Sequence, residues 1–423
     1  NRGMHKERQI LINISQLVTP EGRAAKYGSA MNESKKIMDA AVVVEDGRIA
    51  FVGTTAEVKN AYQLDGEHVR DMHGHTVLPG FVDSHTHFIF GGYRPEEFMM
   101  RQKGVPYIEI HKAGGGIQNT VEATRALDDG EMYRLGEMRL KDMLSMGVTT
   151  VEGKSGYGLD HDCEIRQLQV MKKLNGAQPV SVVNTYLGAH SIPLEYKKDP
   201  DSYLDFMIAE MLPEIKKEKL AEFTDVFCEE GVFTREQSKR LLSAAKEAGF
   251  GLKIHADEIV STGSAELAAE LGAVSADHLL AVSEQGICDM AKSETIATLL
   301  PCTAFCLKKP YAPARKMIDA GCAVALASDY NPGSCFTNSI PLMFALAVIH
   351  MGMTLEEALC ALTLNGAAAV GMEKEIGSIG VGKKADLVVL SDPKYEFLVY
   401  HTAKNLVCEV IKNGKTVYQK GEV

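Results

Sequence analysis

The pattern of hydrophobic and polar positions divides the chain into two β-rich ends and a different middle. At the ends, alternating or continuous apolar runs predict strands at residues 9–14, 41–45, 48–52, 385–390, 407–411 and 415–418. Asp46-Gly47 and Asn413-Gly414 separate paired runs and are typical of two-residue hairpin turns. We therefore expect a small β-sandwich domain built from both chain ends, with two separate β subdomains as the alternative.

The middle of the chain alternates short apolar runs with amphipathic segments. Eight runs predict buried strands, at residues 80–84, 149–152, 180–186, 225–228, 251–254, 274–276, 296–300 and 323–327. Between strands, residues 202–212 and 235–248 have the hydrophobic period of helices. Strands that alternate with helices pair in parallel, so this middle region predicts an α/β protein with a (β/α)8 TIM-like barrel. An open, doubly wound sheet is the runner-up.

The expected domain boundaries follow from these patterns. Residues 1–80 and 373–423 form the composite β domain, and residues 81–372 form the barrel. The connection at 87–132, which follows the first barrel strand, is too long for a simple crossover and contains three consecutive glycines, 114–116. Long loops in barrels usually belong to the active-site face, so we expect the same of this one.

Composition and charge narrow the class of protein. Of 423 residues, 45% are hydrophobic and 24% charged, which excludes a wholly disordered chain. The net charge of −11 disfavours nucleic acid and membrane surfaces as partners, because both are anionic. No apolar run approaches the ~20 residues of a membrane span, and the first residues lack an apolar signal segment. Nine scattered cysteines indicate reduced thiols, so we expect a soluble protein of the cytoplasm.

Histidines and one aspartate stand at the ends of the predicted barrel strands. His85 and His87, two residues apart, point to the same face and supply half of a metal site. Later strand ends add further candidates: His190, His255, His278 and Asp329. Burying unpaired imidazoles and carboxylates is costly, whereas one divalent cation satisfies several of them together. A pair of surface histidines would explain the first two alone, but the whole set predicts a metal site.

The motifs around these residues resemble the metal-dependent amidohydrolase superfamily and, within it, the imidazolonepropionase family of histidine degradation. The resemblance covers nearly the whole chain. Its marks are His-Thr-His at 85–87 running on to Arg94, Gly-Gly-Gly-Ile at 114–117, Lys-Ser-Gly-Tyr-Gly at 154–158, Leu-Gly-Ala-His at 187–190, Lys-Ile-His-Ala-Asp-Glu at 253–258, Ser-Ala-Asp-His at 275–278 and Ser-Asp-Tyr-Asn-Pro-Gly-Ser at 328–334. The first motif is shared with many deaminases, whereas the segments at 154–158 and 255–258 together are specific.

The resemblance implies a site with one zinc or iron ion and a set of substrate contacts. The implied metal ligands are His85, His87, His255 and Asp329. The implied substrate contacts are Arg94, Tyr157, His190, Glu258, Asn331, Gly333 and Ser334. Some relatives bridge two metals with a carboxylated lysine, but the resembling family uses one metal, which disfavours that role for Lys154. Gly153 departs from the pattern, since we expect a bulkier apolar residue there.

The implied reaction is the ring opening of 4-imidazolone-5-propionate to N-formimidoyl-L-glutamate by a metal-activated water. Glu258, three residues beyond His255, is placed to move the proton from the water to the leaving nitrogen; its alternative is an acid at a helix start. His278 is a candidate for orienting the water or the oxyanion, with packing as its alternative, and Asp329 is the third catalytic candidate.

The carboxylate tail of the implied substrate requires a fixed cation. Arg94 offers a planar guanidinium that binds a carboxylate through two parallel hydrogen bonds, and the Tyr157 hydroxyl can share that contact. Without the resemblance, a surface charge in a loop would be the better interpretation of Arg94.

The expected partners are a small-molecule substrate, water, one divalent metal ion per chain and a second copy in a homodimer. The alternative enzyme is a cytosine- or guanine-type aminohydrolase on the same barrel, which needs no carboxylate clamp. A non-catalytic regulatory or scaffolding relative is the third class, and the complete ligand set disfavours it.

Overall fold

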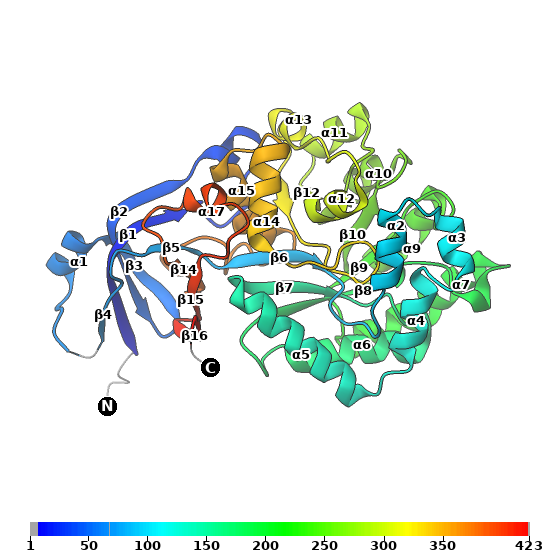
Figure 1. Ribbon diagram of the computed structural model, residues 1–423, viewed down its shortest axis with the longest axis horizontal. Coiled ribbons are helices and arrows are strands. Elements are labelled where there is room, and N and C mark those ends of the chain that lie inside the picture. The colour runs from blue at the N-terminus through cyan, green and yellow to red at the C-terminus, as the bar shows by residue number, and fades with distance from the viewer. Residues whose placement is uncertain (1–6, 67, 422–423) are drawn as a thin grey trace.

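A computed structural model describes residues 7–66 and 68–421 and contains two eight-stranded sheets. One sheet forms the barrel of the middle region, and the other joins the two ends of the chain (Figure 1). The expected combination of a (β/α)8 barrel and a β-rich unit from both termini is therefore confirmed.

The barrel consists of parallel strands in sequential order. They are β6 (Phe81–Thr86), β7 (Val148–Lys154), β8 (Ser181–Ala189), β9 (Phe223–Val226), β10 (Gly251–Ala256), β11 (Ser275–His278), β12 (Ile296–Leu299) and β13 (Val324–Leu326). Each overlaps one of the eight predicted strands. The chain that follows β13 closes the barrel, because Asp329 N donates to His85 O and His87 N donates to Tyr330 O, both at 2.9 Å.

Most of the helices surround the barrel, whereas the first packs on the other sheet (Figure 1). The α-helices are α1 (Thr55–Ala61), α2 (Pro95–Gln102), α3 (Tyr107–Lys112), α4 (Ile117–Arg125), α5 (Asp129–Ser145), α6 (His161–Leu174), α7 (Pro200–Phe206), α8 (Leu212–Lys217), α9 (Arg235–Glu247), α10 (Ser264–Leu271), α11 (Glu284–Ala291), α12 (Pro301–Leu307), α13 (Ala314–Asp319), α14 (Ile340–Ala345), α15 (Leu355–Leu362), α16 (Leu364–Ala368) and α17 (Phe397–Tyr400). Two 3-10 turns, η1 (Gly28–Asn32) and η2 (Leu194–Tyr196), and two π turns, η3 (Met207–Met211) and η4 (Leu346–His350), complete the set in the described chain.

The second sheet is mixed and combines strands from both ends of the chain. Its order is β16-β15-β14-β5-β1-β2-β3, with β4 paired to β1. The strands are β1 (Arg8–Thr19), β2 (Lys35–Glu45), β3 (Arg48–Thr54), β4 (Val69–Asp71), β5 (Thr76–Pro79), β14 (Leu387–Leu390), β15 (Val407–Lys412) and β16 (Lys415–Gln419). Both predicted hairpins form, with positive φ at Asp46, Gly47, Asn413 and Gly414, as tight two-residue turns require.

The two sheets join where β5 of the composite sheet runs into β6 of the barrel. Gly80, between them, donates its N–H to Asp386 O at 2.8 Å. A side chain at Gly80 would meet Thr149 Oγ1 at 2.3 Å, so the close approach of β7 requires glycine here. The largest apolar core surrounds the barrel and extends to Val388 and Val410 of the composite sheet. The two units therefore share a packed boundary, and β6 enters the barrel from a fixed point.

The predicted helix at residues 235–248 corresponds closely to α9. The helix predicted at residues 202–212 is observed as a continuous helical segment made of α7, the π-helix η3 and α8. The apolar period did not indicate the wider turn of the π-helix.

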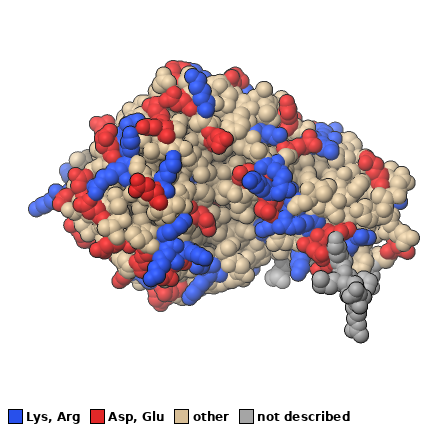
Figure 2. Space-filling model, turned by 180° about the vertical axis from the view of Figure 1, so that it is seen from behind, with Lys and Arg blue, Asp and Glu red and all other residues tan. Residues whose placement is uncertain are grey.

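The surface carries charges of both signs. Figure 2 shows basic and acidic side chains interspersed on the face turned away from the viewer in Figure 1. Within the described residues, the helices are all too short or too polar to cross a membrane.

Candidate active site

The predicted ligands come together at the end of the barrel where the strands terminate. His85 lies near the end of β6, His87 directly follows that strand, His255 lies on β10, His278 ends β11, and Asp329 follows β13. Two of these residues have left-handed backbone angles, with φ of 83° at His278 and 53° at Asp329. Such conformations are unfavourable for residues other than glycine and often occur where a side chain must be aimed at a functional site.

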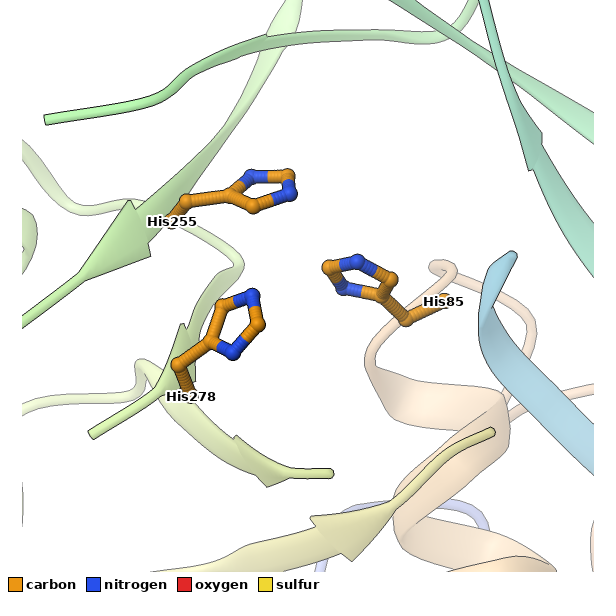
Figure 3. A group of neighbouring side chains, drawn as sticks. All are labelled: His85, His255 and His278. Atoms are coloured by element: carbon orange, nitrogen blue, oxygen red, sulfur yellow. The ribbon is translucent and has the colours of Figure 1, made fainter. Parts of the chain in front are cut away.

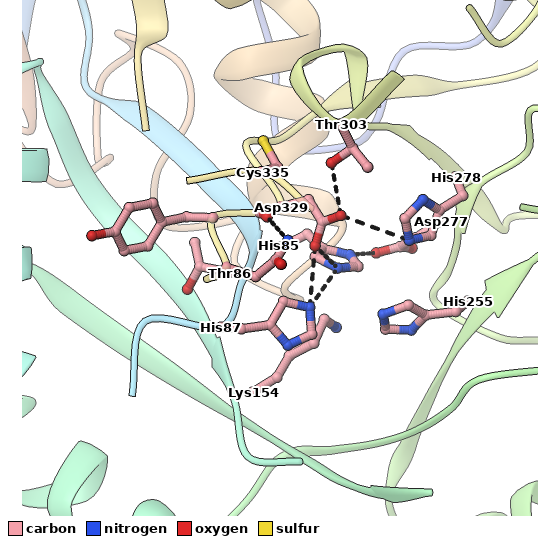
Figure 4. Close-up of polar contacts among 12 residues, drawn as sticks. His85, Thr86, His87, Lys154, His255, Asp277, His278, Thr303, Asp329 and Cys335 are labelled. Atoms are coloured by element: carbon pink, nitrogen blue, oxygen red, sulfur yellow. Dashed lines mark hydrogen bonds and ion pairs between the residues drawn. The ribbon is translucent and has the colours of Figure 1, made fainter. Parts of the chain in front are cut away.

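The ring nitrogens and the Asp329 carboxylate converge on one point. Asp329 Oδ1 lies 3.1 Å from His85 Nε2 and 3.2 Å from His87 Nε2, and the two ring nitrogens are 3.2 Å apart. Two groups have ligand atoms mutually within 4.8 Å: His85 with His87 and Asp329, and His85 with His255 and His278 (Figures 3 and 4). His85 belongs to both groups, so all five residues surround one small volume.

This donor set fits a divalent metal ion. His255 Nε2 is buried and has no hydrogen-bond partner among the described residues. Burial lowers the pKa of His87 to about 4 and that of His278 to about 3, so both rings are neutral at pH 7 and offer lone pairs. Three or four imidazole nitrogens with one carboxylate oxygen are ligands that zinc and iron accept in proteins.

The cluster stabilises positive charge at its centre. Burial and the charge of Lys154 lower the pKa of His85, but the carboxylates of Asp329 and Asp277 on its two ring nitrogens outweigh them and raise it to about 9. Burial opposes the charge of Asp329, yet the charge and hydrogen bond of His85 hold its pKa well below the usual range. Thr303 Oγ1 donates to Asp329 Oδ2 at 2.8 Å and orients this carboxylate.

Glu258 stands beside the cluster, next to His278. Its Oε2 lies 3.5 Å from His278 Nε2. Burial, with smaller contributions from the charges of Asp329 and Glu229, raises its pKa to about 8. A cavity of ≈ 710 Å³ opens beside Glu258 and is also lined by Tyr107 and Thr303. A carboxyl group with a pKa near neutrality can both accept and deliver a proton.

Arg94, which follows the first barrel strand, has a partner that the sequence did not indicate. Glu97 binds its Nε at 2.7 Å and its Nη2 at 2.5 Å, and Glu97 also accepts from Gly116 N at 3.1 Å. The remaining nitrogen, Nη1, faces Gly333, where a Cβ atom would come within 2.6 Å of it. Arg94 is therefore held rigidly, with one edge of its guanidinium turned to the loop that contains Gly333.

Tyr157 and His190 line the site next to His87. The rings of His190 and His87 stack with centroids 5.1 Å apart, and Tyr157 lies 5.2 Å from His190. His190 Nδ1 donates to Gly156 O at 2.9 Å, which leaves its Nε2 as the acceptor. Gly156 has φ of +106°, and a Cβ atom there would meet His190, so the Lys-Ser-Gly-Tyr-Gly segment needs glycine at this position.

The last predicted contacts lie in one loop after β13. Asn331 Nδ2 donates to Asp329 O at 2.6 Å, and its Oδ1 accepts from Gly333 N at 2.9 Å and Ser334 N at 2.8 Å. The Asn331 side chain thus organises the loop itself and sets the positions of Gly333 and Ser334.

Lys154 is paired with two carboxylates, and Gly153 is closely packed by neighbouring side chains. Lys154 Nζ lies 2.6 Å from Glu152 Oε2 and 2.7 Å from Asp225 Oδ2, which keep it protonated and unlike a carboxylated lysine. The expectation of a bulkier residue at 153 is wrong for this chain, because a Cβ there would meet Met171 Sδ at 2.4 Å and Phe88 Cε1 at 2.7 Å.

Sequence reasoning missed the carboxylates behind the ligands. Asp277 accepts from His85, Asp225 from His255, and Glu97 from Arg94. Asp277 directly precedes His278, and Asp225 lies on a short buried strand; a charged residue inside an apolar strand was the available signal in both cases.

Comparison with known proteins identifies close relatives in sequence. The model of the amidohydrolase family matches residues 76–417. The chain is 54% identical over 417 residues to an imidazolonepropionase of Clostridium tetani, covering 99% of this chain and 100% of the relative. It is 56% identical over 413 residues to an imidazolonepropionase of Parabacteroides distasonis, covering 97% and 99%.

Solved structures with the same fold are more distant. A zinc-bound adenosine deaminase from Xanthomonas campestris superposes with a TM-score of 0.71 at 20% identity, covering 98% of this chain and 94% of that one. A guanine deaminase from C. acetobutylicum gives 0.68 at 15% identity, covering 97% and 100%. At such identities the similarity concerns the fold alone.

Proposed function

Because the chain belongs to the amidohydrolase family and, by similarity over almost its whole length, to the imidazolonepropionases, we propose that it opens the ring of 4-imidazolone-5-propionate. The protein is a hydrolase of a cyclic amide C–N bond, and the product is N-formimidoyl-L-glutamate, an intermediate of histidine degradation. The observation that carries this proposal is the juxtaposition of the five-residue ligand cluster with Glu258 and a rigidly held Arg94 at one barrel end.

We further propose that the site binds one divalent ion per chain, zinc or iron, through His85, His87, His255 and Asp329. The unpartnered Nε2 of His255 and the convergence of the other ligand atoms support this set. When bound, the ion lowers the pKa of a water molecule and polarises the carbonyl oxygen of the cyclic amide. His278, whose Nε2 lies 3.9 Å from Asp329 Oδ2, stands on the side of Glu258 and orients the water or the oxyanion.

Glu258 transfers the proton in this proposal. Its carboxylate takes a proton from the attacking water, and the resulting carboxylic acid gives it to the ring nitrogen as the amide C–N bond breaks. The raised pKa of Glu258, about 8, stabilises its protonated form at neutral pH, which is the form that gives the proton to the ring nitrogen.

Arg94 and Tyr157 bind the propionate carboxylate. Glu97 holds two nitrogens of Arg94, and the third, Nη1, donates only a long hydrogen bond to Thr120 Oγ1 at 3.4 Å and faces Gly333. The Tyr157 hydroxyl is buried, and burial raises its pKa well above the usual value, so it remains a hydrogen-bond donor. His190 Nε2 and the Asn331 loop complete the pocket around the ring of the substrate.

A nucleobase aminohydrolase is the alternative function. Its support is weak, because this chain shares only the fold with the solved deaminases. To test between the two, the purified protein is offered imidazolonepropionate, cytosine and guanine, and loss of ultraviolet absorbance is followed. We expect depletion of imidazolonepropionate alone. Release of ammonia from a nucleobase would contradict the proposal, and no turnover of any of the three would favour the non-catalytic class.

We also propose that the protein is a homodimer of the cytoplasm, with residues 81–372 as the catalytic barrel and residues 1–80 and 373–423 as the composite domain.

A further inference from the structure

A layer of charged side chains lies directly beneath the ligand cluster, inside the barrel. It consists of Glu152 and Lys154 on β7, Asp225 on β9, Lys253 on β10 and Asp277 on β11, all essentially inaccessible to solvent. Burial of charge is costly unless each group is paired, and replacement by apolar side chains of similar size often stabilises a protein. Such a layer therefore needs a reason beyond the stability of the barrel.

Two carboxylates of this layer each hold one ligand imidazole from behind. Asp277 Oδ2 accepts from His85 Nδ1 at 2.5 Å, and Asp225 Oδ1 accepts from His255 Nδ1 at 3.1 Å. A proton on Nδ1 leaves the lone pair on Nε2, the nitrogen that faces the centre of the cluster. The other two histidines of the cluster, His87 and His278, have buried Nδ1 atoms without such a partner among the described residues.

Lys154 connects one of these carboxylates to the rest of the layer, and Figure 4 shows this side chain beside His87. Its Nζ lies 2.7 Å from Asp225 Oδ2 and 2.6 Å from Glu152 Oε2. Glu152 in turn accepts from Thr185 Oγ1 at 2.6 Å. A carboxylate is planar and rigid, so fixing Oδ2 of Asp225 also fixes Oδ1, the atom that orients His255.

Lys253 offers a matched comparison within the same layer. It is as deeply buried as Lys154, but its Nζ donates to Ala369 O at 2.7 Å and to Ser275 Oγ at 3.3 Å. The carboxylate nearest to it, Glu152, is 3.9 Å away and does not contact a ligand histidine. The two lysines therefore share burial and charge but differ in their connection to the metal ligands.

We propose that Lys154 is a positioning residue for the metal site: it fixes Asp225, which holds His255 with Nε2 toward the ion. The inference rests on the proposed metal site, not on the proposed substrate. It predicts that Lys154 determines how tightly the ion is held, while Lys253 does not.

The test compares Lys154→Met with Lys253→Met in the full-length zinc-loaded protein. Each variant removes one buried ammonium group and keeps an unbranched side chain. Zinc is titrated out with a chromophoric chelator, and the visible spectrum of the cobalt-loaded protein reports the ligand geometry. We expect about 10–100-fold weaker zinc binding and an altered cobalt spectrum for Lys154→Met, and wild-type values for Lys253→Met. Wild-type zinc binding by Lys154→Met, or an equal loss in Lys253→Met, would overturn the proposal.

A double-mutant cycle tests whether Lys154 acts through Asp225. If it does, Lys154→Met combined with Asp225→Asn binds zinc no more weakly than Asp225→Asn alone. Additive losses would show that Lys154 acts independently and would overturn the proposal. If Lys154→Met does not fold, because Glu152 and Asp225 then face each other unpaired, the double variant Glu152→Gln/Lys154→Met replaces it. This variant removes one charge of each sign, and its zinc binding is judged by the same expected and contradicting results. Since zinc release involves no substrate, this result is independent of the proposed reaction.

Discussion

Two fully buried strands, one in each sheet, differ in the polarity of their buried side chains. Every residue of β14 in the composite sheet is buried, and its sequence is Leu-Val-Val-Leu. Every residue of β6 in the barrel is buried too, but its sequence is Phe-Val-Asp-Ser-His-Thr. Both strands pair with neighbours in their sheets, β14 with β5 and β15 and β6 with β7, but their side chains differ.

The difference shows that stability and chemistry are carried by different parts of this molecule. Apolar side chains on β14 contribute to folding through burial alone. On β6, Asp83 accepts from Ser328 N and Oγ, and His85 is held by two carboxylates; these groups need partners from distant strands to be buried at all. Substitutions in the two strands should therefore have separable effects on turnover and on unfolding.

The largest effect on turnover is expected for His85→Ala in β6. His85 is the one residue shared by both ligand groups, so its loss should abolish ring opening and release the metal. Metal content by elemental analysis and the rate with imidazolonepropionate check this, with the exposed His401→Ala as the control. A variant with metal and rate intact would show that the site lies elsewhere.

Glu258→Gln should have the next largest effect. The amide keeps the shape of the side chain but cannot carry the proton, so kcat should fall roughly 10²–10⁴-fold. Metal content should stay normal, because Glu258 is outside the proposed ligand set. The exposed Glu230→Gln is the matched control. An unchanged kcat would transfer the proton role to His278 or Asp329.

Arg94→Met should impair one class of substrate more than another. The loss of a charge-assisted contact to the propionate should weaken transition-state binding by about 2–5 kcal/mol, and kcat/KM should fall accordingly. An analogue with an amidated tail should lose much less, and kinetics with both substrates check the difference. Equal losses for the acid and the amide would show that Arg94 acts only as the partner of Glu97.

The smallest effect on turnover is expected in the composite sheet. Leu387→Ala in β14 creates a cavity in a fully buried apolar layer and should lower the free energy of unfolding by about 2–5 kcal/mol. Denaturant unfolding measures this, while kcat and metal content of the folded protein should remain those of the wild type. A fall in kcat in proportion to the lost stability would show that the composite sheet also shapes the site.

Much of the architecture could be predicted because its signals are local. The hairpins at Asp46-Gly47 and Asn413-Gly414 depend on turn residues, and the barrel strands depend on short apolar runs. The proximity of His85, His255 and Asp329 could be predicted as well, since the ends of parallel strands in a barrel meet at one face. The π-helical turn at η3 carried no comparable signal, because it differs from an α-helix in its backbone hydrogen bonds, which the apolar pattern does not report.

The sequence by itself determined which residue types stand at the strand ends, and therefore where the candidate metal site lies. Only the tertiary structure decided how those residues are paired. Glu97 rather than solvent occupies two nitrogens of Arg94, and Lys154 lies between Glu152 and Asp225 rather than at the metal centre. The physical reason is that secondary structure depends on local spacing, whereas ion pairs depend on distances between strands that are far apart in the chain.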